Sequence, residues 1–313
     1  MTFPAACLKI TFNMDTLILF GGLGSRLSNG RKIINSKVHS GLNVYYNEVG
    51  PKALAGLTIN GQSRPLLDYQ LAIQRANGGS LYLGLGALAA MVQLYCSNKF
   101  GASYYGQPLH YLIEERPAGT VAPLIKMHNA GYLNDKPLLM VNGDNLMDIN
   151  LAAALAGGLE AARANHIGET GIIDIVSAVP RAASAAYGVL DINHSNNLAV
   201  SFKEKQAAHL NPYQLVDGAE LCYVNSGFSF IINPLAFFNK YVTKEIIELS
   251  AQLEAGRLNY KENEKLVKYE SLYEKVAAAG QMAVVKHYGY WSDSGSEEDM
   301  LKIEANYQPD LPD

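Results

Sequence analysis

This chain contains little cysteine and no long apolar runs. Three cysteines, Cys7, Cys96 and Cys222, occur among 313 residues and none belongs to a CxxC pair. This usage argues against a disulfide framework or a zinc knuckle and is typical of a reducing compartment. No apolar stretch approaches the roughly 18–20 residues that a membrane-spanning helix requires, and residues 1–13 lack the apolar core of a signal peptide. The sequence therefore predicts a cytoplasmic protein with no membrane contact.

Positive charge is also in short supply, and two common groups of hydrolase motifs are missing. Twenty-five Lys and Arg against 29 Asp and Glu give a formal net charge of −4. No basic block is long enough to follow a nucleic-acid backbone. The seven histidines show no HExxH or HxE spacing, and Ser226 lacks a GxSxG elbow. Nucleic-acid binding, zinc-dependent hydrolysis and serine hydrolysis are therefore unsupported.

The residues that are present form the pattern of an α/β protein. Hydrophobic residues make up 49% of the chain and charged residues 17%, which is ordinary for a globular protein. Short apolar runs alternate with amphipathic stretches, as in a fold with a largely parallel sheet. After Pro180 the apolar runs become shorter. We expect strands at 16–20, 80–85, 109–113, 137–141 and 172–179, and helices at 65–76, 87–96, 120–130 and 151–164.

A glycine-rich turn follows the first expected strand. Residues 21–26 read Gly-Gly-Leu-Gly-Ser-Arg, and glycines there let backbone N–H groups approach an anion closely. The dinucleotide fingerprint would need Gly at Leu27, and a P-loop would need Gly-Lys-Ser/Thr at 29–31, so neither familiar motif is present. The turn with a solvated Arg26 is the simpler interpretation. The Ser-Arg pair after the glycines favours phosphate binding.

A second candidate feature is Asn142-Gly143-Asp144, which ends another apolar run. Ligands bind at the carboxyl ends of parallel strands, and a carboxylate beside a glycine suits Mg²⁺ held jointly with substrate phosphates. An Asx turn is the structural alternative. One aspartate rarely suffices, and the candidate partner is Asp293, in a segment that also reads as a polar turn before a helix capped by Ser296.

Two lysines complete the candidate chemistry. Lys52 follows Pro51, which fixes the local backbone, and Lys205 follows Glu204 at the end of a short apolar run. A solvated surface side chain is the alternative for each. Residues 28–50 are polar and Asn-rich without a clear period, so they form either a long surface loop or a lid.

In this order, the motifs resemble those of the sugar-1-phosphate nucleotidylyltransferases, the hexose-1-phosphate pyrophosphorylase family. The family signature GGxG[ST]RL matches residues 21–27, its Pro-Lys pair residues 51–52, and its Trp-x-Asp-x-Gly residues 291–295. Its Glu…Gly-Thr, Gly-Asp, Tyr-Gly-Val, Glu-Lys and Asn-x-Gly elements match 115–120, 143–144, 187–189, 204–205 and 225–227. Each motif is weak alone, but together they span about residues 16–305. Residues 115–120 look closer to the mannose- and heptose-1-phosphate guanylyltransferase type than to the thymidylyl type.

The chain departs from the family pattern at two places. Residues 28–50 stand where the family has a short Pro-containing loop, and Gln206 replaces the Pro that commonly follows Glu-Lys. The insertion makes the transfer of a role to Lys52 less secure than the transfer to Arg26.

The resemblance implies a single Rossmann-like α/β nucleotidyltransferase domain over residues 14–313, with a mixed, mostly parallel sheet. Residues 1–13 would be an N-terminal extension and 180–295 a smaller sugar-binding β part. It implies that a sugar 1-phosphate attacks an NTP with Mg²⁺ as cofactor. Members of the family often form dimers, so a homodimer is one possibility, and the sequence leaves the oligomeric state open. The implied roles are catalysis for Arg26, Lys52 and Asp144; nucleotide binding for Gly21, Gly22, Gly24, Ser25, Gly119 and Thr120; sugar-phosphate binding for Gly143, Tyr187, Gly188, Glu204, Lys205, Asn225 and Gly227; and metal binding for Asp144 and Asp293.

Two other functions compete with this interpretation. A nucleotide-sugar-dependent glycosyltransferase usually holds its metal with a D-x-D motif, and Asp144 and Asp148 are spaced too widely for one. A catalytically inactive regulatory subunit that binds a nucleotide sugar tends to lose the signature Arg or the metal Asp, and both are present here as Arg26 and Asp144. The sequence leaves the choice of base and sugar open.

Overall fold

The computed structural model of the chain describes residues 13–21, 51–86 and 88–309. The expected N-terminal extension, the insertion at 28–50 and most of the glycine-rich turn lie outside the described residues, among them Gly22, Gly24, Ser25 and Arg26.

The N-terminal half of the described chain is built around four parallel strands. These are β1 (Met14–Phe20), β4 (Gly78–Leu85), β6 (Gln107–Ile113) and β7 (Leu138–Asn142), arranged in the order β7-β1-β4-β6. β1 and β7 are apolar along most of their length, as is usual for parallel strands with both faces covered, whereas β6 is partly exposed. Leu17 and Ile18, neighbours on β1, are fully buried on opposite faces of the sheet.

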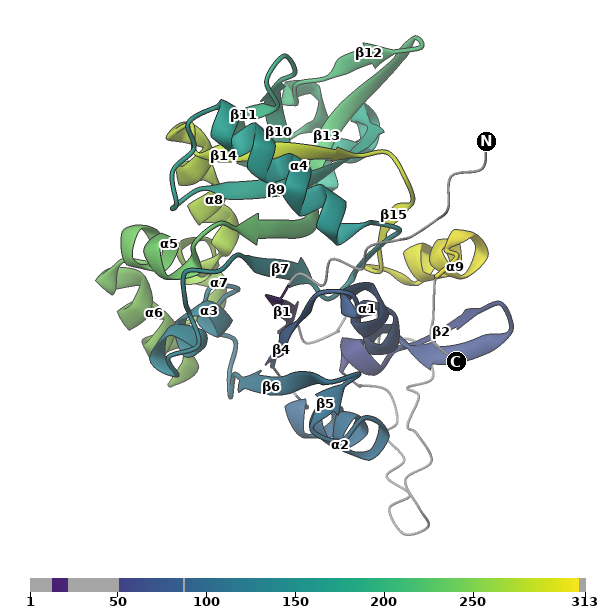
Figure 1. The fold of residues 1–313 in the computed structure, drawn as a ribbon, viewed down its shortest axis with the longest axis vertical. Helices are drawn as coiled ribbons and strands as arrows, with labels where there is room; N and C mark the ends of the chain where they lie inside the picture. Colours follow the sequence, from purple (N-terminus) through teal and green to yellow (C-terminus); the bar gives the residue numbers. More distant parts are fainter. Residues whose placement is uncertain (1–12, 22–50, 87, 310–313) are drawn as a thin grey trace, which may run out of the picture.

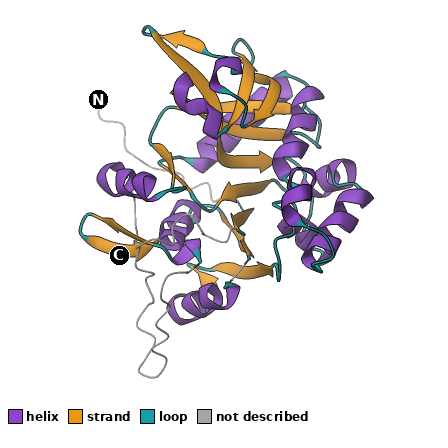
Figure 2. Ribbon diagram, turned by 180° about the vertical axis from the view of Figure 1, so that it is seen from behind, coloured by secondary structure: helices purple, strands orange, loops and turns teal. Residues whose placement is uncertain are grey.

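Two layers of helices pack on the two faces of the sheet as a whole (Figure 2). One layer consists of α1 (Leu66–Gln74), α2 (Ala89–Lys99), α4 (Leu151–Ala164) and α9 (Glu297–Asn306). The other consists of α3 (Ala122–Asn129), α5 (Pro234–Tyr241), α6 (Lys244–Glu254) and α8 (Tyr269–Ala278). The helix at 151–164 and the N-cap at Ser296 are both confirmed, the latter because the Ser296 hydroxyl accepts from the Asp299 N–H. No helix in the described part of the chain is both long and apolar enough to cross a membrane.

In the C-terminal half of the chain, most neighbouring strands of the sheet run antiparallel. Its main strands are β9 (Ile172–Pro180), β10 (Gly188–Asn193), β11 (Leu198–Glu204), β13 (Ala219–Ile231) and β14 (Met282–His287). β13 pairs antiparallel with β7 and so joins the two halves (Figure 1). β10 pairs with both β11 and β13, while β14 links β11 to β9, so these five strands close on themselves like a small barrel.

A mixed sheet is therefore confirmed, but the expectation that it is mostly parallel was wrong, and the Rossmann-like description is not confirmed. Most pairings between the described strands are antiparallel. The physical reason lies after Pro180, where β10 and β11 are joined by a short turn at residues 194–197. A connection that short allows only antiparallel neighbours, whereas parallel strands need a long crossover.

Smaller elements complete the structure and bring distant segments together. The strand β8 (Asn145–Met147) pairs with β15 (Trp291–Asp293), and α9 packs beside β2 (Gly56–Ile59), where the Thr58 N–H donates to Glu304 at 2.8 Å. The remaining elements are β3 (Gln62–Pro65), β5 (Ser103–Tyr104), β12 (Gln214–Val216), α7 (Tyr260–Asn263) and 3₁₀ turns at Lys52–Leu54, Arg181–Ala186, Ala208–Leu210 and Glu264–Val267.

Candidate active site

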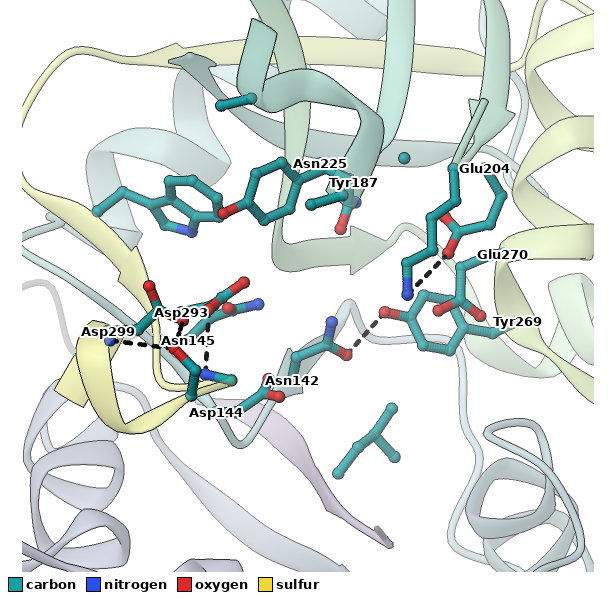
Figure 3. A pocket seen from close by; sticks show the side chains of 18 of the residues that line it. Asn142, Asp144, Asn145, Tyr187, Glu204, Asn225, Tyr269, Glu270, Asp293 and Asp299 are labelled. Carbon is teal, nitrogen blue, oxygen red and sulfur yellow. Dashed lines mark hydrogen bonds and ion pairs between the residues drawn. The ribbon is translucent and has the colours of Figure 1, made fainter. Parts of the chain in front are cut away.

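A cavity of about 720 Å³ opens at the carboxyl ends of β1 and β7 and extends to β11 and β13. Figure 3 shows acidic side chains on two sides of it, with Asn142 between them. Eight of the residues singled out from the sequence line this one cavity: Lys52, Asp144, Tyr187, Gly188, Glu204, Lys205, Asn225 and Asp293.

Asp144 and Asp293 meet although they stand far apart in the sequence. The β8–β15 pairing places Asp293 opposite Asn145. Both the N–H and the hydroxyl of Ser294 donate to the Asp144 carbonyl, at 2.7 and 2.8 Å. Gly143 makes the preceding turn possible, because a Cβ there would lie 2.4 Å from the Phe20 ring. The turn therefore sits directly on the end of β1.

Negative charge exceeds positive charge around these two aspartates. Lys52 lies in the 3₁₀ turn after Pro51, and its Nζ is 2.9 Å from Asp144 Oδ2. Burial raises the pKa of Asp293, and the nearby carboxylates of Asp144 and Asp299 raise it further. The Tyr187 hydroxyl is hydrogen-bonded to Asp293, and its own pKa rises to about 12 through burial and these acids. Such a site favours the binding of a cation.

Within the described part of the chain, no three His, Cys, Asp or Glu side chains form a complete metal site. Asp144 and Asp293 alone would give a cation two oxygen-donating side chains. Mg²⁺ is commonly held by one or two carboxylates together with water and substrate phosphates. The donor set therefore fits Mg²⁺ bound jointly with a phosphorylated substrate.

The opposite side of the cavity carries the Tyr-Gly and Glu-Lys motifs. Gly188 pairs with Glu204 across β10 and β11, and a Cβ on Gly188 would lie 2.9 Å from Glu204 Oε2. The Lys205 N–H donates to the Tyr187 carbonyl at 3.1 Å. Lys205 has a φ of +47°, and its Nζ lies 3.6 Å from Glu204 Oε1. The two motifs thus fold as one unit with one amine beside one carboxylate.

Asn225 reaches the cavity from an irregularity in β13. Gly227, two residues later, has a φ of +79°, and a Cβ on it would lie 1.9 Å from Asn145 Nδ2. The Trp291 indole N–H donates to the Ser226 carbonyl at 2.8 Å. A glycine is needed here because β13 passes so close to the turn that carries Asp144.

Gly119 and Thr120 are not among the described residues that line the cavity, and they contact the end of the 3₁₀ turn Glu264–Val267 and the start of α8. A Cβ on Gly119 would lie 2.3 Å from the Val267 carbonyl oxygen. The Thr120 hydroxyl accepts from the Tyr269 N–H at 2.9 Å and donates to Glu270 at 3.3 Å. The Gly-Thr element thus holds a segment whose next residues face the cavity, while its expected contact with the nucleotide stays a prediction.

That segment supplies two residues that the sequence did not reveal. Tyr269 and Glu270 line the cavity, and the Tyr269 hydroxyl donates to Asn142 Oδ1 at 2.7 Å. Burial and then the neighbouring Glu204 raise the pKa of Glu270 to about 7. No sequence signal distinguishes Glu270, since acids are common in the first turn of any helix.

Another buried acid, Glu114, lies beside Gly21 at the start of the glycine-rich turn, outside the lining of the cavity given by the described residues. A Cβ built on Gly21 would lie 3.4 Å from its carboxylate, which accepts from the Ala118 N–H at 2.9 Å. Burial raises the pKa of Glu114 to about 7. Its place directly after a parallel strand was a usable signal, because the carboxyl ends of such strands form ligand sites.

Comparison with known proteins identifies the family. The profile of the nucleotidyl transferase family matches residues 90–309. The chain belongs to the nucleotidyl transferase family. The family resemblance drawn from the order of the motifs is thereby confirmed.

Individual nucleotidyl transferases are similar over different shares of the chain. D-glycero-α-D-manno-heptose 1-phosphate guanylyltransferase from Aneurinibacillus thermoaerophilus is 27% identical over 139 residues, 44% of this chain, and the chain spans about half of that relative's length, 49%. Among solved structures, HddC from Yersinia pseudotuberculosis aligns with a TM-score of 0.59 at 17% identity, covering 94% of this chain and all of that one. HddC complexed with GMP-PN aligns equally well. At this identity, the structural likeness shows the shared fold.

Proposed function

We propose that the protein transfers a nucleoside monophosphate from an NTP to a sugar 1-phosphate, forming a nucleotide sugar and pyrophosphate. The observation that carries the proposal is the joining of two sites in one cavity. Asp144, Asp293 and Lys52 stand on one side, and Glu204 and Lys205 on the other. Membership of the nucleotidyl transferase family supports this division into a nucleotide side and an acceptor side.

The reaction requires positioning and charge neutralisation more than proton transfer. The attacking oxygen of a sugar 1-phosphate is already an anion, so no general base is needed. Lys205 neutralises the acceptor phosphate, and Glu204 and Asn225 bind the sugar hydroxyls. Lys52 acts on the reacting phosphates, while Arg26 and the backbone of residues 21–25 hold the departing pyrophosphate.

Asp144 and Asp293 are the residues that would hold Mg²⁺. When bound, the ion would neutralise negative charge on the phosphates of both substrates. Lys52 already contacts Asp144 at 2.9 Å, so its amine is placed to turn from that carboxylate toward a phosphate.

We propose GTP with a mannose or heptose 1-phosphate as the substrate pair to test first. The support is the relative named as a heptose 1-phosphate guanylyltransferase and the HddC structure complexed with GMP-PN. Residues 180–295 are proposed as the acceptor-binding part. A homodimer and a cytoplasmic location complete the proposal, and sedimentation and cell fractionation test them.

The deciding experiment measures pyrophosphate release with Mg²⁺, using five NTPs against a panel of hexose and heptose 1-phosphates. Asp144→Asn removes the proposed metal ligand. Asp148→Asn is the matched control, because Asp148 follows four residues later and pairs with His287 at 3.1 Å outside the cavity lining.

We expect one productive pair, lost in Asp144→Asn and retained in Asp148→Asn. Silence across the panel while nucleotide still binds would overturn the proposal in favour of an inactive regulatory subunit. Full activity of Asp144→Asn would refute the metal assignment alone.

A further inference from the structure

One buried acid beneath the acceptor side has no place in the mechanism so far. Asp174 lies in the middle of β9, opposite Ser229 of β13 and Val284 of β14, and its side chain is fully buried. Its neighbours on the same face of β9, Ile172 and Val176, belong to an apolar cluster. Burying an acid among apolar side chains is costly unless its polar atoms are satisfied, and Asp174 Oδ2 has no hydrogen-bond partner. Such a group needs an explanation.

The other oxygen of Asp174 holds a residue of the cavity wall. Asn225 Nδ2 donates to Asp174 Oδ1 at 2.6 Å, and Asn225 Oδ1 accepts from the Gly227 N–H at 2.9 Å. The two contacts fix which end of the amide is nitrogen and which is oxygen. One N–H and one lone pair remain for a ligand, each in a defined direction.

Regular pairing of β13 with β9 does not set the orientation of the Asn225 side chain. Asn225 stands opposite Val176 while Phe228 stands opposite Ile175, so residues 226–227 form a bulge in β13. Bulges re-aim side chains beside active sites. The bulge turns Asn225 toward the cavity, and Asp174 is the side chain that holds its amide there.

We propose that Asp174 is a positioning residue for the acceptor, acting by fixing the Asn225 amide. The role rests on the proposed function, in which Asn225 binds hydroxyls of the sugar 1-phosphate. Asp174 itself touches no ligand. Acceptor affinity should therefore depend on Asp174, while nucleotide affinity should not.

The protonation state of Asp174 sets which substitution mimics it. Burial raises the pKa of Asp174 to about 8, against a smaller lowering by the Asn225 hydrogen bond. From α8, Tyr269 and Tyr273 face it, and both have pKa values above 10, while Ser229 and Val284 on the flanking strands carry no charge. Asp174 is thus mostly neutral at pH 7, so Asn is a close substitute in charge, shape and hydrogen-bond acceptor.

Three variants separate positioning from a merely structural role. Asp174→Leu keeps an apolar core but removes the acceptor of the Asn225 hydrogen bond, Asp174→Asn restores an oxygen, and Ser177→Ala is the matched control. Ser177 is another buried polar residue of β9, and its hydroxyl has no hydrogen-bond partner and lies outside the cavity lining.

The kinetic readout is KM for the acceptor against KM for the NTP in pyrophosphate release. We expect Asp174→Leu to raise the acceptor KM about tenfold, the equivalent of one hydrogen bond of about 1.4 kcal/mol, with the NTP KM unchanged. Asp174→Asn should recover most of the acceptor affinity, and Ser177→Ala should leave both constants alone. Equal rises in both KM values, or no rescue by Asn, would overturn the positioning role.

A second readout does not depend on activity. In ¹H–¹⁵N spectra, the Asn225 side-chain amide, assigned by its absence from Asn225→Asp, should be protected from exchange in the wild type and in Asp174→Asn. It should lose that protection in Asp174→Leu while the backbone spectrum is retained. If the wild type is inactive on every substrate pair, the proposed function fails, and this measurement still decides whether Asp174 fixes the amide. An unchanged Asn225 signal in Asp174→Leu would refute the inference directly.

Discussion

Replacing Gly119 by alanine is expected to loosen one wall of the cavity from a distance. Gly119 has a φ of +98°, where an L-residue is strained by roughly 1 kcal/mol. The added Cβ would lie 2.3 Å from the Val267 carbonyl oxygen, against an ordinary contact of 3.4 Å or more. Val267 must therefore retreat by about 1 Å, and an overpacked contact of this kind costs roughly 1–3 kcal/mol. The two effects together predict a loss of roughly 2–4 kcal/mol in the free energy of unfolding.

A glycine at the other end of α3 provides the control. Gly131 also has a positive φ, +72°, but a Cβ there would meet nothing within 4 Å. Gly131→Ala should therefore show only the strain of roughly 1 kcal/mol. Urea unfolding of both variants isolates the contact with Val267. Because Tyr269 and Glu270 follow Val267 into the cavity, acceptor binding should also weaken in Gly119→Ala alone. Equal stability of the two variants would refute the idea that Gly119 is needed for the close contact with Val267.

Three further results are expected. Lys52→Met should reduce pyrophosphate release by roughly 10²–10³-fold, as for other single electrostatic donors, and a smaller effect would remove Lys52 from the reacting phosphates. Between pH 4 and pH 8 the wild type should lose stability relative to Asp174→Asn, because the folded state keeps a proton on Asp174 that the unfolded state releases above pH 3.8. Over this pH range the difference in the free energy of unfolding should change by roughly 5 kcal/mol. A difference that does not change with pH would contradict the raised pKa. Mg²⁺ at 100 times its Kd should stabilise the wild type by roughly 2.7 kcal/mol in thermal melts, an increase that Asp144→Asn and Asp293→Asn should abolish and chelation should reverse.

The four parallel strands and the main helices of the N-terminal half were predictable because apolar runs and amphipathic stretches alternate there, whereas the short strands β2, β3, β5 and β8 were not expected. The helix at 151–164 was found within its expected bounds because apolar residues such as Leu151 and Leu155 repeat with a helical period. The direction of the later strands was not predictable, because the length of an apolar run carries no information about its partner. Pairing in β10 and β11 depends on the turn between them, whose role was not recognised.

Some residues of the candidate site could likewise be predicted from the sequence, and others could not. Gly143 and Gly188 were singled out from the sequence because they stand in the Gly-Asp and Tyr-Gly-Val motifs, and the structure adds that a Cβ on either would lie closer than 3 Å to another side chain. Glu270 and Asp174 were not found, because an acid in a helix and an acid in a strand look like surface residues. Their meaning comes from burial and from partners far away in the chain, which only the folded structure shows.

The pairing of β15 with β8 also has a consequence for the order in which the chain folds. Asp293 reaches Asp144 only when residues 291–295 dock across a loop of nearly 150 residues, and α9 then packs against β2. Contacts between such distant segments close late, because the entropy of the long loop opposes them until the intervening strands have formed. The proposed cation site would therefore be completed at the end of folding, so the return of Mg²⁺-dependent stabilisation during refolding should lag behind the recovery of helical and sheet signals.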